Sequence, residues 1–339
     1  MASKTTAIKN VRVFDGFKMS EMTTVVMENG LISDKKTADV VIDGKGGFLM
    51  PGLIDSHSHL TWKKNARSCV RAGVTSTFSI GSTEKVKKLS DSTRIFSTYG
   101  RAIGSCEDGR AFVAEEAANG AAYIKIVVED RPMMAKTRIT QEVMNVIAEE
   151  THKRGLLLAT HAVSVPTLQM AIDAKTDIYI HVPLEADMTP EMAAQIAAQN
   201  ASCVPTLAMM KGFADIPIYG YKKEDYKHSE NNARMLHEAG VPLLVGTDAS
   251  NLIFLPWVKF GKDLHKEMQL MAGAGLKPEE ILAGVTGLAA AAYGVDSVGT
   301  LEPGRRADLI LIDGNPNQNI ADTAKIRRVW IGGNEVFHK

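Results

Sequence analysis

His57 and His59 end an apolar segment, MPGLIDSHSH, and a single serine separates them. In a β-strand, residues i and i+2 point to the same face, so both imidazoles would project together from the end of one strand. Imidazole nitrogen is a common ligand of Zn²⁺ and related divalent ions. The spacing therefore predicts part of a metal site, although a histidine pair by itself is equally compatible with capping or hydrogen bonding.

Four more candidate metal ligands follow along the chain: Lys125 in AAYIKIVV, His161 at the end of LLLATH, His181 in DIYIHV, and Asp248 at the end of PLLVGTD. Four histidines and one aspartate are more than one tetrahedral site needs, whereas two metal ions would use all of them. Each residue also has a structural interpretation when it is taken singly. A strand lysine can reach solvent or pair with a carboxylate, a strand-end histidine can form a hydrogen bond, and an aspartate can cap the next segment.

Two metal ions would need a bridging ligand, and Lys125 is the candidate. A neutral lysine amine can take up CO₂ and become a carbamate, which carries a negative charge and two oxygen atoms. The apolar residues on both sides of Lys125 predict its burial. Burial lowers the pKa of an amine and favours the neutral form that this reaction requires.

These residues have to be positioned by strands, and the middle of the chain alternates short β-branched segments with helical patterns. Eight strands are predicted, at residues 52–58, 74–80, 94–102, 121–128, 156–161, 177–182, 201–206 and 242–248. Helices are predicted at 140–155, with Thr140 as N-cap and Gly155 as C-cap, and at 189–200, and the segment 277–295 follows the eighth strand. Eight such units predict an α/β protein with a (β/α)₈ TIM-like barrel, whose working residues lie at the carboxyl ends of the strands.

Both chain ends differ from this pattern. Residues 6–50 contain short segments in which apolar and polar residues alternate, as in β-strands, with the turn signals Asp15-Gly16, Asn29-Gly30 and Asp43-Gly44. The same strand-like pattern occurs in ADLILIDGNP and IRRVWIGGNEVF. We therefore predict a small β-sandwich domain formed by residues 1–50 and 300–339, and a barrel domain formed by residues 51–299.

The composition argues against several kinds of partner. The chain has 339 residues, 45% hydrophobic and 23% charged, which is typical of a globular protein with a substantial core. The chain has 39 basic residues (lysine and arginine) and 39 acidic residues (aspartate and glutamate), so its formal net charge is zero. Net charge would therefore hold neither a nucleic acid nor an anionic membrane. No secretory signal and no apolar run of the ~20 residues that span a bilayer are visible. The three cysteines are far apart and lack CxxC spacing, so we expect a reducing, cytoplasmic location.

The motifs around the candidate ligands resemble those of the amidohydrolase superfamily, in particular its branch of imidazolonepropionase-like and Xaa-Pro dipeptidase (prolidase-like) enzymes. LMPGLIDSHSHL resembles the first-strand motif and RAGVTSTFSIG the second. IKI resembles the fourth-strand segment with the carboxylated lysine, and VPTL and LLVGTDAS resemble the seventh- and eighth-strand motifs. The closing segments LHKEMQLMAGAGLKPEEILAGVTGLAAAAYGV and VGTLEPGRRADLILIDGNP extend the resemblance over nearly the whole chain.

The resemblance implies a binuclear metal centre with one shared ligand. One ion would be held by His57, His59, Lys125 and Asp248, and carboxylated Lys125 would bridge to a second ion held by His161 and His181. Zn²⁺ is the first candidate metal, while Mn²⁺, Co²⁺ and Fe²⁺ share these ligands. The branch usually reads HAHG and EHG at the fifth and sixth strands, where this chain has THAVS and IHVP. These departures, with short segments after the first and third strands, put a prolidase substrate in doubt.

We therefore expect a binuclear metal-dependent hydrolase of amide, cyclic amide, ester or carbamate bonds in a small molecule or dipeptide. Two divalent ions bridged by a carbamate and a hydroxide would lower the pKa of the bound water towards ~7 and polarise the substrate carbonyl. Asp248 would face the bridging oxygen and is the candidate general base. Tyr219, Tyr221 and Arg110 are expected in loops at the mouth, and the AMM segment at 208–210 is a candidate for the pocket wall, but the sequence does not identify the substrate-binding residues.

Two alternatives stay open. One is a metal-dependent lyase or isomerase on the same scaffold, and the other is a non-catalytic relative that keeps the barrel for assembly. A scaffold would need none of the six candidate ligands, so their retention argues against the second alternative. The expected partner is a small-molecule substrate, with no nucleic acid and no membrane, and the resemblance implies a homo-oligomer.

Overall fold

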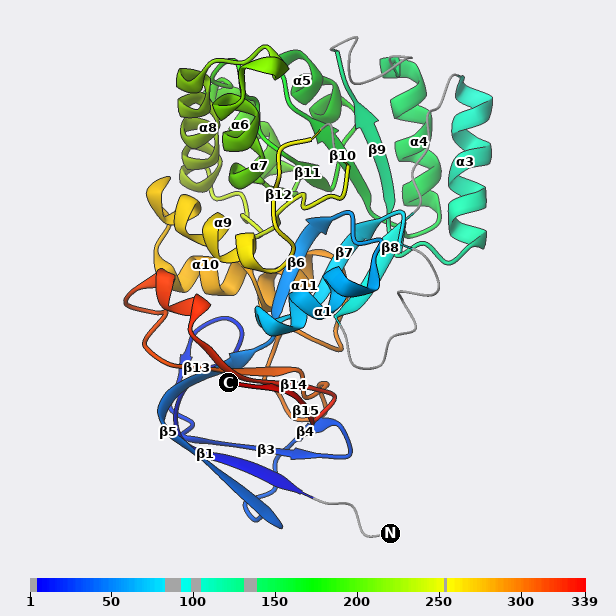
Figure 1. Cartoon of the computed structure of the whole chain (residues 1–339). Helices are drawn as coiled ribbons and strands as arrows, with labels where there is room; N and C mark the ends of the chain where they lie inside the picture. Colours follow the sequence, from blue (N-terminus) through cyan, green and yellow to red (C-terminus); the bar gives the residue numbers. More distant parts are fainter. Residues whose placement is uncertain (1–4, 83–92, 99–104, 131–138, 253–254) are drawn as a thin grey trace.

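The computed structural model describes residues 5–82, 93–98, 105–130, 139–252 and 255–339, and it has a mixed α/β fold with two regions (Figure 1). One region contains parallel strands surrounded by helices. The other is a sheet that lies below these strands in Figure 1 and contains the C-terminus, with the N-terminus beside it. The predicted α/β class is therefore confirmed.

Eight strands from the two ends of the chain form one sheet, in the order β15-β14-β13-β5-β1-β3-β4 with β2 paired to β1. These strands are β1 (Thr6–Phe14), β2 (Met19–Ser20), β3 (Thr24–Glu28), β4 (Leu31–Ser33), β5 (Val40–Pro51), β13 (Leu309–Ile312), β14 (Ile326–Ile331) and β15 (Asn334–His338). β5 joins the two ends because it pairs in parallel with β1 and antiparallel with β13. The sheet agrees with the small β unit predicted from both ends. Its division into a two-layer sandwich and the domain boundaries stay predictions.

Seven parallel strands run through the middle of the described chain. β6 (Leu53–Ser58), β7 (Val74–Ile80) and β8 (Arg94–Thr98) form one sheet, and β9 (Ile124–Val128), β10 (Leu158–Ala162), β11 (Ile178–Ile180) and β12 (Ser202–Val204) form another. Each overlaps a strand predicted from the sequence. Residues 99–102 of the third predicted strand lie outside the described residues.

The eighth predicted strand, residues 242–248, forms isolated bridges instead of a regular strand. Leu243 bridges in parallel to Cys203 of β12, and Ala249 bridges in parallel to Ser58 of β6. The segment 242–249, here called the bridging segment, therefore connects the two parallel sheets. The backbone of Asp248, near the end of this segment, adopts a φ of +56°, which regular strands do not contain.

The opposite edges of the two parallel sheets also meet. The N–H of Ala122, just before β9, donates a hydrogen bond to the carbonyl of Ser97 in β8 (3.0 Å). Side chains from both sheets and from the bridging segment share one hydrophobic cluster, which includes Ile54, Phe78, Ala159, Ile180, Val204 and Leu244. The strands therefore face a common interior, where their apolar side chains are removed from water.

Helices surround the parallel strands. They are α1 (Lys63–Arg71), α3 (Cys106–Ala118), α4 (Gln141–Lys153), α5 (Val165–Asp173), α6 (Pro190–Ala198), α7 (Leu207–Asp215), α8 (Tyr226–Glu238), α9 (Lys262–Gly273), α10 (Pro278–Gly284) and α11 (Gly287–Ala292), with 3₁₀ turns at Pro217–Tyr219, Lys223–Asp225 and Ile320–Ala324. The predicted N-cap of α4 is confirmed, because the Thr140 side chain accepts a hydrogen bond from the N–H of Val143. The predicted C-cap is wrong by one residue, because Arg154 is the C-cap and Gly155 follows it with a φ of +67°. Among the described residues, no helix has the length and apolar character to cross a bilayer.

The segment 277–295 forms two helices, α10 and α11, with a break at Thr286. The Thr286 hydroxyl contacts the carbonyls of Gly16 (3.0 Å) and Leu282 (2.6 Å). A contact with the N-terminal segment therefore replaces the regular helical pattern at this point.

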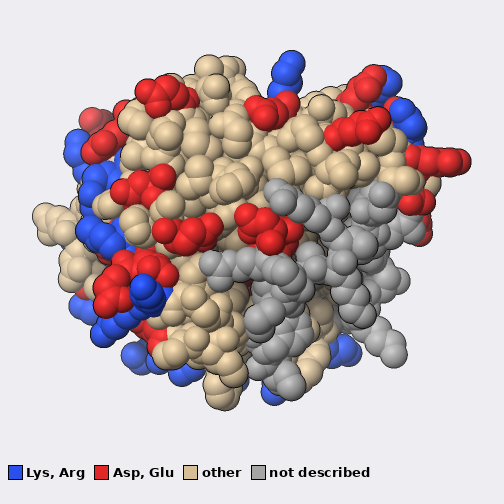
Figure 2. Space-filling model, turned by 90° about the horizontal axis from the view of Figure 1, so that it is seen from above, with Lys and Arg blue, Asp and Glu red and all other residues tan. Residues whose placement is uncertain are grey.

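The surface carries both signs of charge. On the face in Figure 2, which looks down on the top of the Figure 1 view, acidic side chains are scattered across a largely uncharged surface, and basic side chains lie mostly toward the margin. This distribution matches the balanced composition of the chain.

Gly284, the last residue of α10, allows this helix to approach the bridging segment. A Cβ atom there would lie 2.5 Å from the carbonyl oxygen of Leu243. We expect Gly284→Ala to lower the free energy of unfolding by about 1–3 kcal/mol, as overpacking does, measured by urea unfolding. Gly273→Ala is the matched control, because Gly273 ends α9 and has no atom within 4 Å of the added Cβ. The control should be neutral or stabilise by up to about 1 kcal/mol; equal effects of both variants would contradict the close approach.

Candidate metal centre

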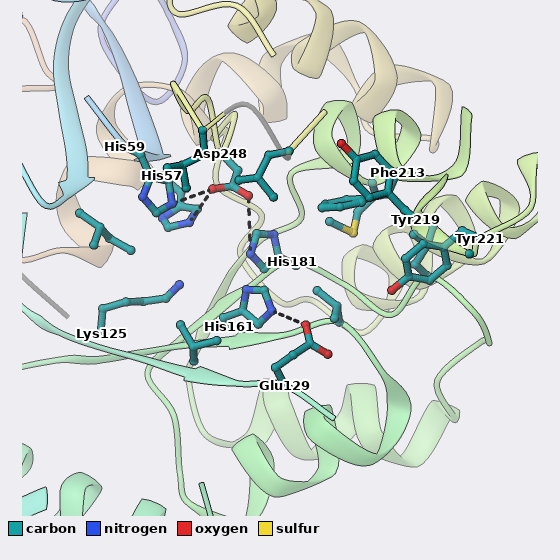
Figure 3. Close-up of a pocket in the computed structure, with 18 residues that line it drawn as sticks. His57, His59, Lys125, Glu129, His161, His181, Phe213, Tyr219, Tyr221 and Asp248 are labelled. Atoms are coloured by element: carbon teal, nitrogen blue, oxygen red, sulfur yellow. Dashed lines mark hydrogen bonds and ion pairs between the residues drawn. The ribbon is translucent and has the colours of Figure 1, made fainter. Parts of the chain in front are cut away.

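The six predicted ligands line one cavity of about 480 Å³ (Figure 3). They come from five parts of the chain: His57 and His59 from the end of β6, Lys125 from β9, His161 from β10, His181 from the residue after β11, and Asp248 from the bridging segment. The structure thus brings together residues that are nearly 200 positions apart in the sequence.

Asp248 lies between three of the histidines. Its Oδ1 is 3.2 Å from Nε2 of His57 and 3.0 Å from Nε2 of His59, and its Oδ2 is 4.0 Å from Nε2 of His181 (Figure 3). One ligand atom each from His57, His181 and Asp248 lies within 4.8 Å of the others. Within the described part of the chain, Oδ1 is buried without a regular hydrogen bond, and a cation would satisfy such an acceptor. The donor set therefore fits a divalent metal ion.

His161 and Lys125 complete the group. The rings of His161 and His181 lie edge to face, with 4.5 Å between their centroids. The Lys125 side chain is almost fully buried and extends toward the histidines in Figure 3. The structure therefore brings all six candidate residues to one cavity, and their role as metal ligands stays a prediction.

Burial sets the protonation of the basic ligands. Desolvation, with the nearby charge of Lys125, lowers the pKa of His57 to about 3. Desolvation also lowers the pKa of His161, and it holds the pKa of His181 well below its usual value. Neutral imidazole is the form that offers a lone pair to a metal ion. At neutral pH these three histidines are therefore in the neutral form that can bind a metal ion.

The two remaining charged groups respond differently to burial. Desolvation lowers the pKa of Lys125 to about 7, although the charge of Asp248 opposes this shift. A large share of the amine is therefore neutral near pH 7. Burial by itself would raise the pKa of Asp248, but the neighbouring His57 and His59 rings hold this pKa well below its usual value. Asp248 therefore stays ionised as an acceptor.

Asp55 fixes the bridging segment beside β6. Its carboxylate accepts hydrogen bonds from the N–H (2.9 Å) and the hydroxyl (2.7 Å) of Thr247, the residue before Asp248. The Thr247 oxygen in turn accepts a hydrogen bond from the N–H of Ala249 (3.0 Å). The residues on both sides of Asp248 are thereby held in place. Burial raises the pKa of Asp55 to about 7, while these hydrogen bonds oppose the rise.

Thr206 contacts His181 at the ring nitrogen that faces away from Asp248, and Glu267 fixes the turn that carries Thr206. The Thr206 hydroxyl oxygen lies 2.6 Å from Nδ1 of His181, so Nε2 is the nitrogen that faces Asp248. Glu267 of α9 accepts hydrogen bonds from the N–H groups of Leu207 (2.7 Å) and Ala208 (2.6 Å), the first residues of α7. These bonds fix the turn that carries Thr206, whose φ is +49°. Non-glycine residues hold such a conformation only where surrounding contacts enforce it.

Glu129 also lines the cavity and was missed in the sequence analysis. Its side chain is buried, and its Oε2 lies 3.4 Å from Nε2 of His161. Lys125, Val127 and Glu129 occupy alternate positions, so they face the same side of β9 and the turn that follows it. An acidic residue four positions after the candidate lysine, at the end of the same strand, was the signal that could have found it.

Several side chains from the mouth loops also line the cavity. Tyr219 and Tyr221 do so, as expected, together with Met210 of the AMM segment and Phe213 of α7. The expectation for Arg110 is wrong. Ser105 caps the start of α3 by accepting a hydrogen bond from the N–H of Asp108, so Arg110 lies on an exposed helix instead of a mouth loop.

Comparisons with known proteins agree with this arrangement. A family model described as the amidohydrolase family matches residues 48–336. The chain is 24% identical to an enamidase of Eubacterium barkeri, covering 94% of this chain and 89% of that protein. It is 25% identical to an uncharacterized protein of Mycobacterium tuberculosis, covering 64% of this chain and 67% of that protein. A solved Xaa-Pro dipeptidase with bound methionine in the active site shares the fold, with a TM-score of 0.83 and 20% identity over 99% of this chain and 100% of that chain.

The contact between Thr206 and His181 predicts a test of metal binding. Thr206→Val removes the hydroxyl beside Nδ1 of His181, so we expect the affinity for Zn²⁺ to fall about 10- to 100-fold, as it does when the partner of a ligating histidine is lost. Equilibrium dialysis against buffered Zn²⁺ measures this affinity. Thr206→Ser keeps the hydroxyl and is the control, with affinity near that of the wild type. A Val variant that binds Zn²⁺ as tightly as the Ser variant would remove Thr206 from this role.

Proposed function

The chain belongs to the amidohydrolase family, and from this premise we propose that it is a binuclear metal-dependent hydrolase of amide, cyclic amide, ester or carbamate bonds in small molecules. One observation carries the proposal: six side chains with metal-ligand chemistry converge on one cavity around the buried carboxylate of Asp248. The names of two similar proteins, an enamidase and a Xaa-Pro dipeptidase, support a carbon–nitrogen bond as the target.

The proposed architecture is the eight-stranded barrel. The two parallel sheets and the bridging segment would close into one ring, with the candidate ligands at its carboxyl end. The bridges at Leu243 and Ala249 on one side, and the Ala122–Ser97 hydrogen bond on the other, support this closure. A barrel of this kind places residues from different strands at one mouth, where enzymes of this architecture carry out their chemistry.

In the proposed centre, the ligands divide into two sets. His57, His59 and Asp248 would hold one divalent ion, His161 and His181 would hold the other, and Lys125 as a carbamate would lie between them. When bound, the ions polarise a substrate carbonyl and lower the pKa of a water molecule at the site. Zn²⁺ as the metal, the carbamate, a cytoplasmic location and a homo-oligomeric state stay predictions.

Asp248 is the proposed general base. Its carboxylate stays ionised because the neighbouring His57 and His59 rings outweigh the effect of burial on its pKa. It would take a proton from the attacking water as the new C–O bond forms. It would then return this proton to the leaving nitrogen as the C–N bond breaks, which gives a carboxylic acid and an amine. A substrate that covered the apolar cavity wall would exclude water from the site and strengthen these electrostatic interactions.

The role of Asp248 predicts a specific loss of activity. Asp248→Asn should bind metal and remain folded, while turnover of amide substrates falls by at least ~10², the usual contribution of a general base. Steady-state kinetics with metal analysis of the same samples measures this loss. Asp215→Asn, which changes an exposed carboxylate paired with Lys211, is the control and should not alter turnover. Near-normal turnover in a metal-loaded Asp248→Asn protein would exclude Asp248 as the base.

The proposed carbamate predicts a dependence on CO₂. Metal-depleted wild-type protein should regain Zn²⁺ slowly in CO₂-depleted buffer and faster with bicarbonate, because the neutral Lys125 amine has to be carboxylated before it can bridge. In [¹³C]bicarbonate, the reloaded protein should give a carbamate resonance in the ¹³C NMR spectrum. Lys125→Met should give neither the resonance nor the bicarbonate effect. A reloaded wild-type protein without this resonance would contradict the carbamate.

A further inference from the structure

The carboxylate of Glu129 contacts His161 at one ring nitrogen. Oε2 of Glu129 lies 3.4 Å from Nε2 of His161, within hydrogen-bonding distance. In Figure 3 the His161 ring lies between the amine of Lys125 and the carboxylate of Glu129. An ionised carboxylate can only accept a hydrogen bond, and a neutral imidazole has one N–H donor and one lone-pair acceptor. The contact therefore places the proton of His161 on Nε2 and leaves the lone pair on Nδ1.

The strand register brings Glu129 to this position. Val127 of β9 pairs with His161 of β10, so their side chains lie on the same side of the sheet. Glu129 comes two residues after Val127, and both side chains line the cavity. The carboxylate thus reaches His161 from the neighbouring strand, at the end where the candidate ligands gather.

Further hydrogen bonds fix the direction of the carboxylate. Glu129 is only 4% exposed, and its Oε1 accepts a hydrogen bond from the N–H of Asp130 (3.0 Å). Asp130 in turn accepts a hydrogen bond from the hydroxyl of Ser164 (2.7 Å), the residue that caps the start of α5. Ser164 follows His161 by three positions. The turn after β9 and the turn after β10 are therefore tied together around the contact between Glu129 and His161.

His161 and His181 have partners at opposite ring nitrogens. The Thr206 hydroxyl lies beside Nδ1 of His181, whereas the Glu129 carboxylate lies beside Nε2 of His161. A histidine that binds a metal ion through one nitrogen usually donates the N–H of the other to such a partner, which fixes the orientation of the ring. A carboxylate partner also makes the ligating nitrogen more basic.

We propose that Glu129 is a positioning residue of the metal centre, which holds the proton of His161 on Nε2 so that Nδ1 faces an ion, while His181 offers Nε2 to the same ion. The hydrogen bond is long at 3.4 Å. A cation at Nδ1 would polarise the Nε2–H group and strengthen its attraction to the carboxylate. The inference rests on the second ion of the proposed function, but the ligating nitrogen and the affinity are measured without turnover.

NMR of wild-type protein tests the assigned nitrogen. Protein labelled with ¹⁵N is depleted of metal and reloaded with ¹¹³Cd²⁺, an NMR-visible substitute for Zn²⁺, in bicarbonate buffer. We expect one ¹¹³Cd resonance to couple to Nδ1 of His161 and to Nε2 of His181, with the proton of His161 retained on Nε2. Coupling to Nε2 of His161, or the absence of any ¹¹³Cd coupling to His161, would overturn the inference.

A variant tests the contribution of the carboxylate. Glu129→Gln keeps the size of the side chain and removes its charge, so we expect the ¹¹³Cd²⁺ ion at His161 to bind about 10-fold more weakly, while the ion at His57 changes by less than about 3-fold. Titration with a chelator, followed through the two ¹¹³Cd resonances, measures both affinities.

Glu149→Gln is the control for this variant, because it changes an exposed carboxylate of α4 that pairs with Lys153; both affinities should match those of the wild type. Equal weakening of both ions in Glu129→Gln, or no weakening at His161, would contradict the positioning role. The coupling pattern of the wild-type protein tests the inference even if the variant does not fold.

The outcomes also separate this inference from the proposed reaction. If ¹¹³Cd²⁺ couples to Nδ1 of His161 and Glu129→Gln weakens that ion selectively, but metal-loaded wild-type protein hydrolyses no amide or ester, the proposed function fails and the inference stands. If the wild-type protein hydrolyses amides while ¹¹³Cd²⁺ couples to Nε2 of His161, the hydrolase stands and the inference fails.

Discussion

The centre depends on the hydrogen bonds between Asp55 and Thr247. Asp55 lies two residues before His57 on β6, and Thr247 lies directly before Asp248 in the bridging segment. This buried contact therefore sets the distance between the HxH pair and the carboxylate that the histidines surround. It also supports a positive φ at Asp248, which a regular strand would not allow. Loss of either partner would leave a buried polar group unpaired, which is more costly than the bond itself is stabilising.

A layered organisation follows from this constraint. Polar groups such as Asp55, Thr206 and Glu267 lie behind the candidate ligands and fix their orientation. Burial keeps three of the histidines neutral and brings the pKa of Lys125 near 7, so the basic groups are available for coordination and carboxylation. In front of the ligands, the wall around Phe213 is apolar. The candidate metal ligands and the apolar wall thus lie on different sides of one cavity.

Much of the fold was predictable because it is encoded locally. Alternating and β-branched residues specify the strands, and the HxH spacing places both imidazoles of β6 on one side. The departures come from contacts that join distant segments. Thr286, at the break between α10 and α11, contacts Gly16, 270 residues away, and Asp55 of β6 binds Thr247 of the eighth segment. Glu129 carried a local signal, its position after Lys125. Tyr219 and Tyr221 were expected at the mouth, whereas Phe213 of α7, which packs against Tyr219, was not.

A crystal structure of Zn²⁺-loaded protein with anomalous diffraction at the zinc edge tests the central claim most directly. The account predicts two zinc peaks in the cavity, one beside His57, His59 and Asp248 and the other beside His161 and His181, with a carboxylated Lys125 between them. Zinc peaks outside this cavity, or a Zn²⁺-saturated protein with no peak near Asp248, would contradict it.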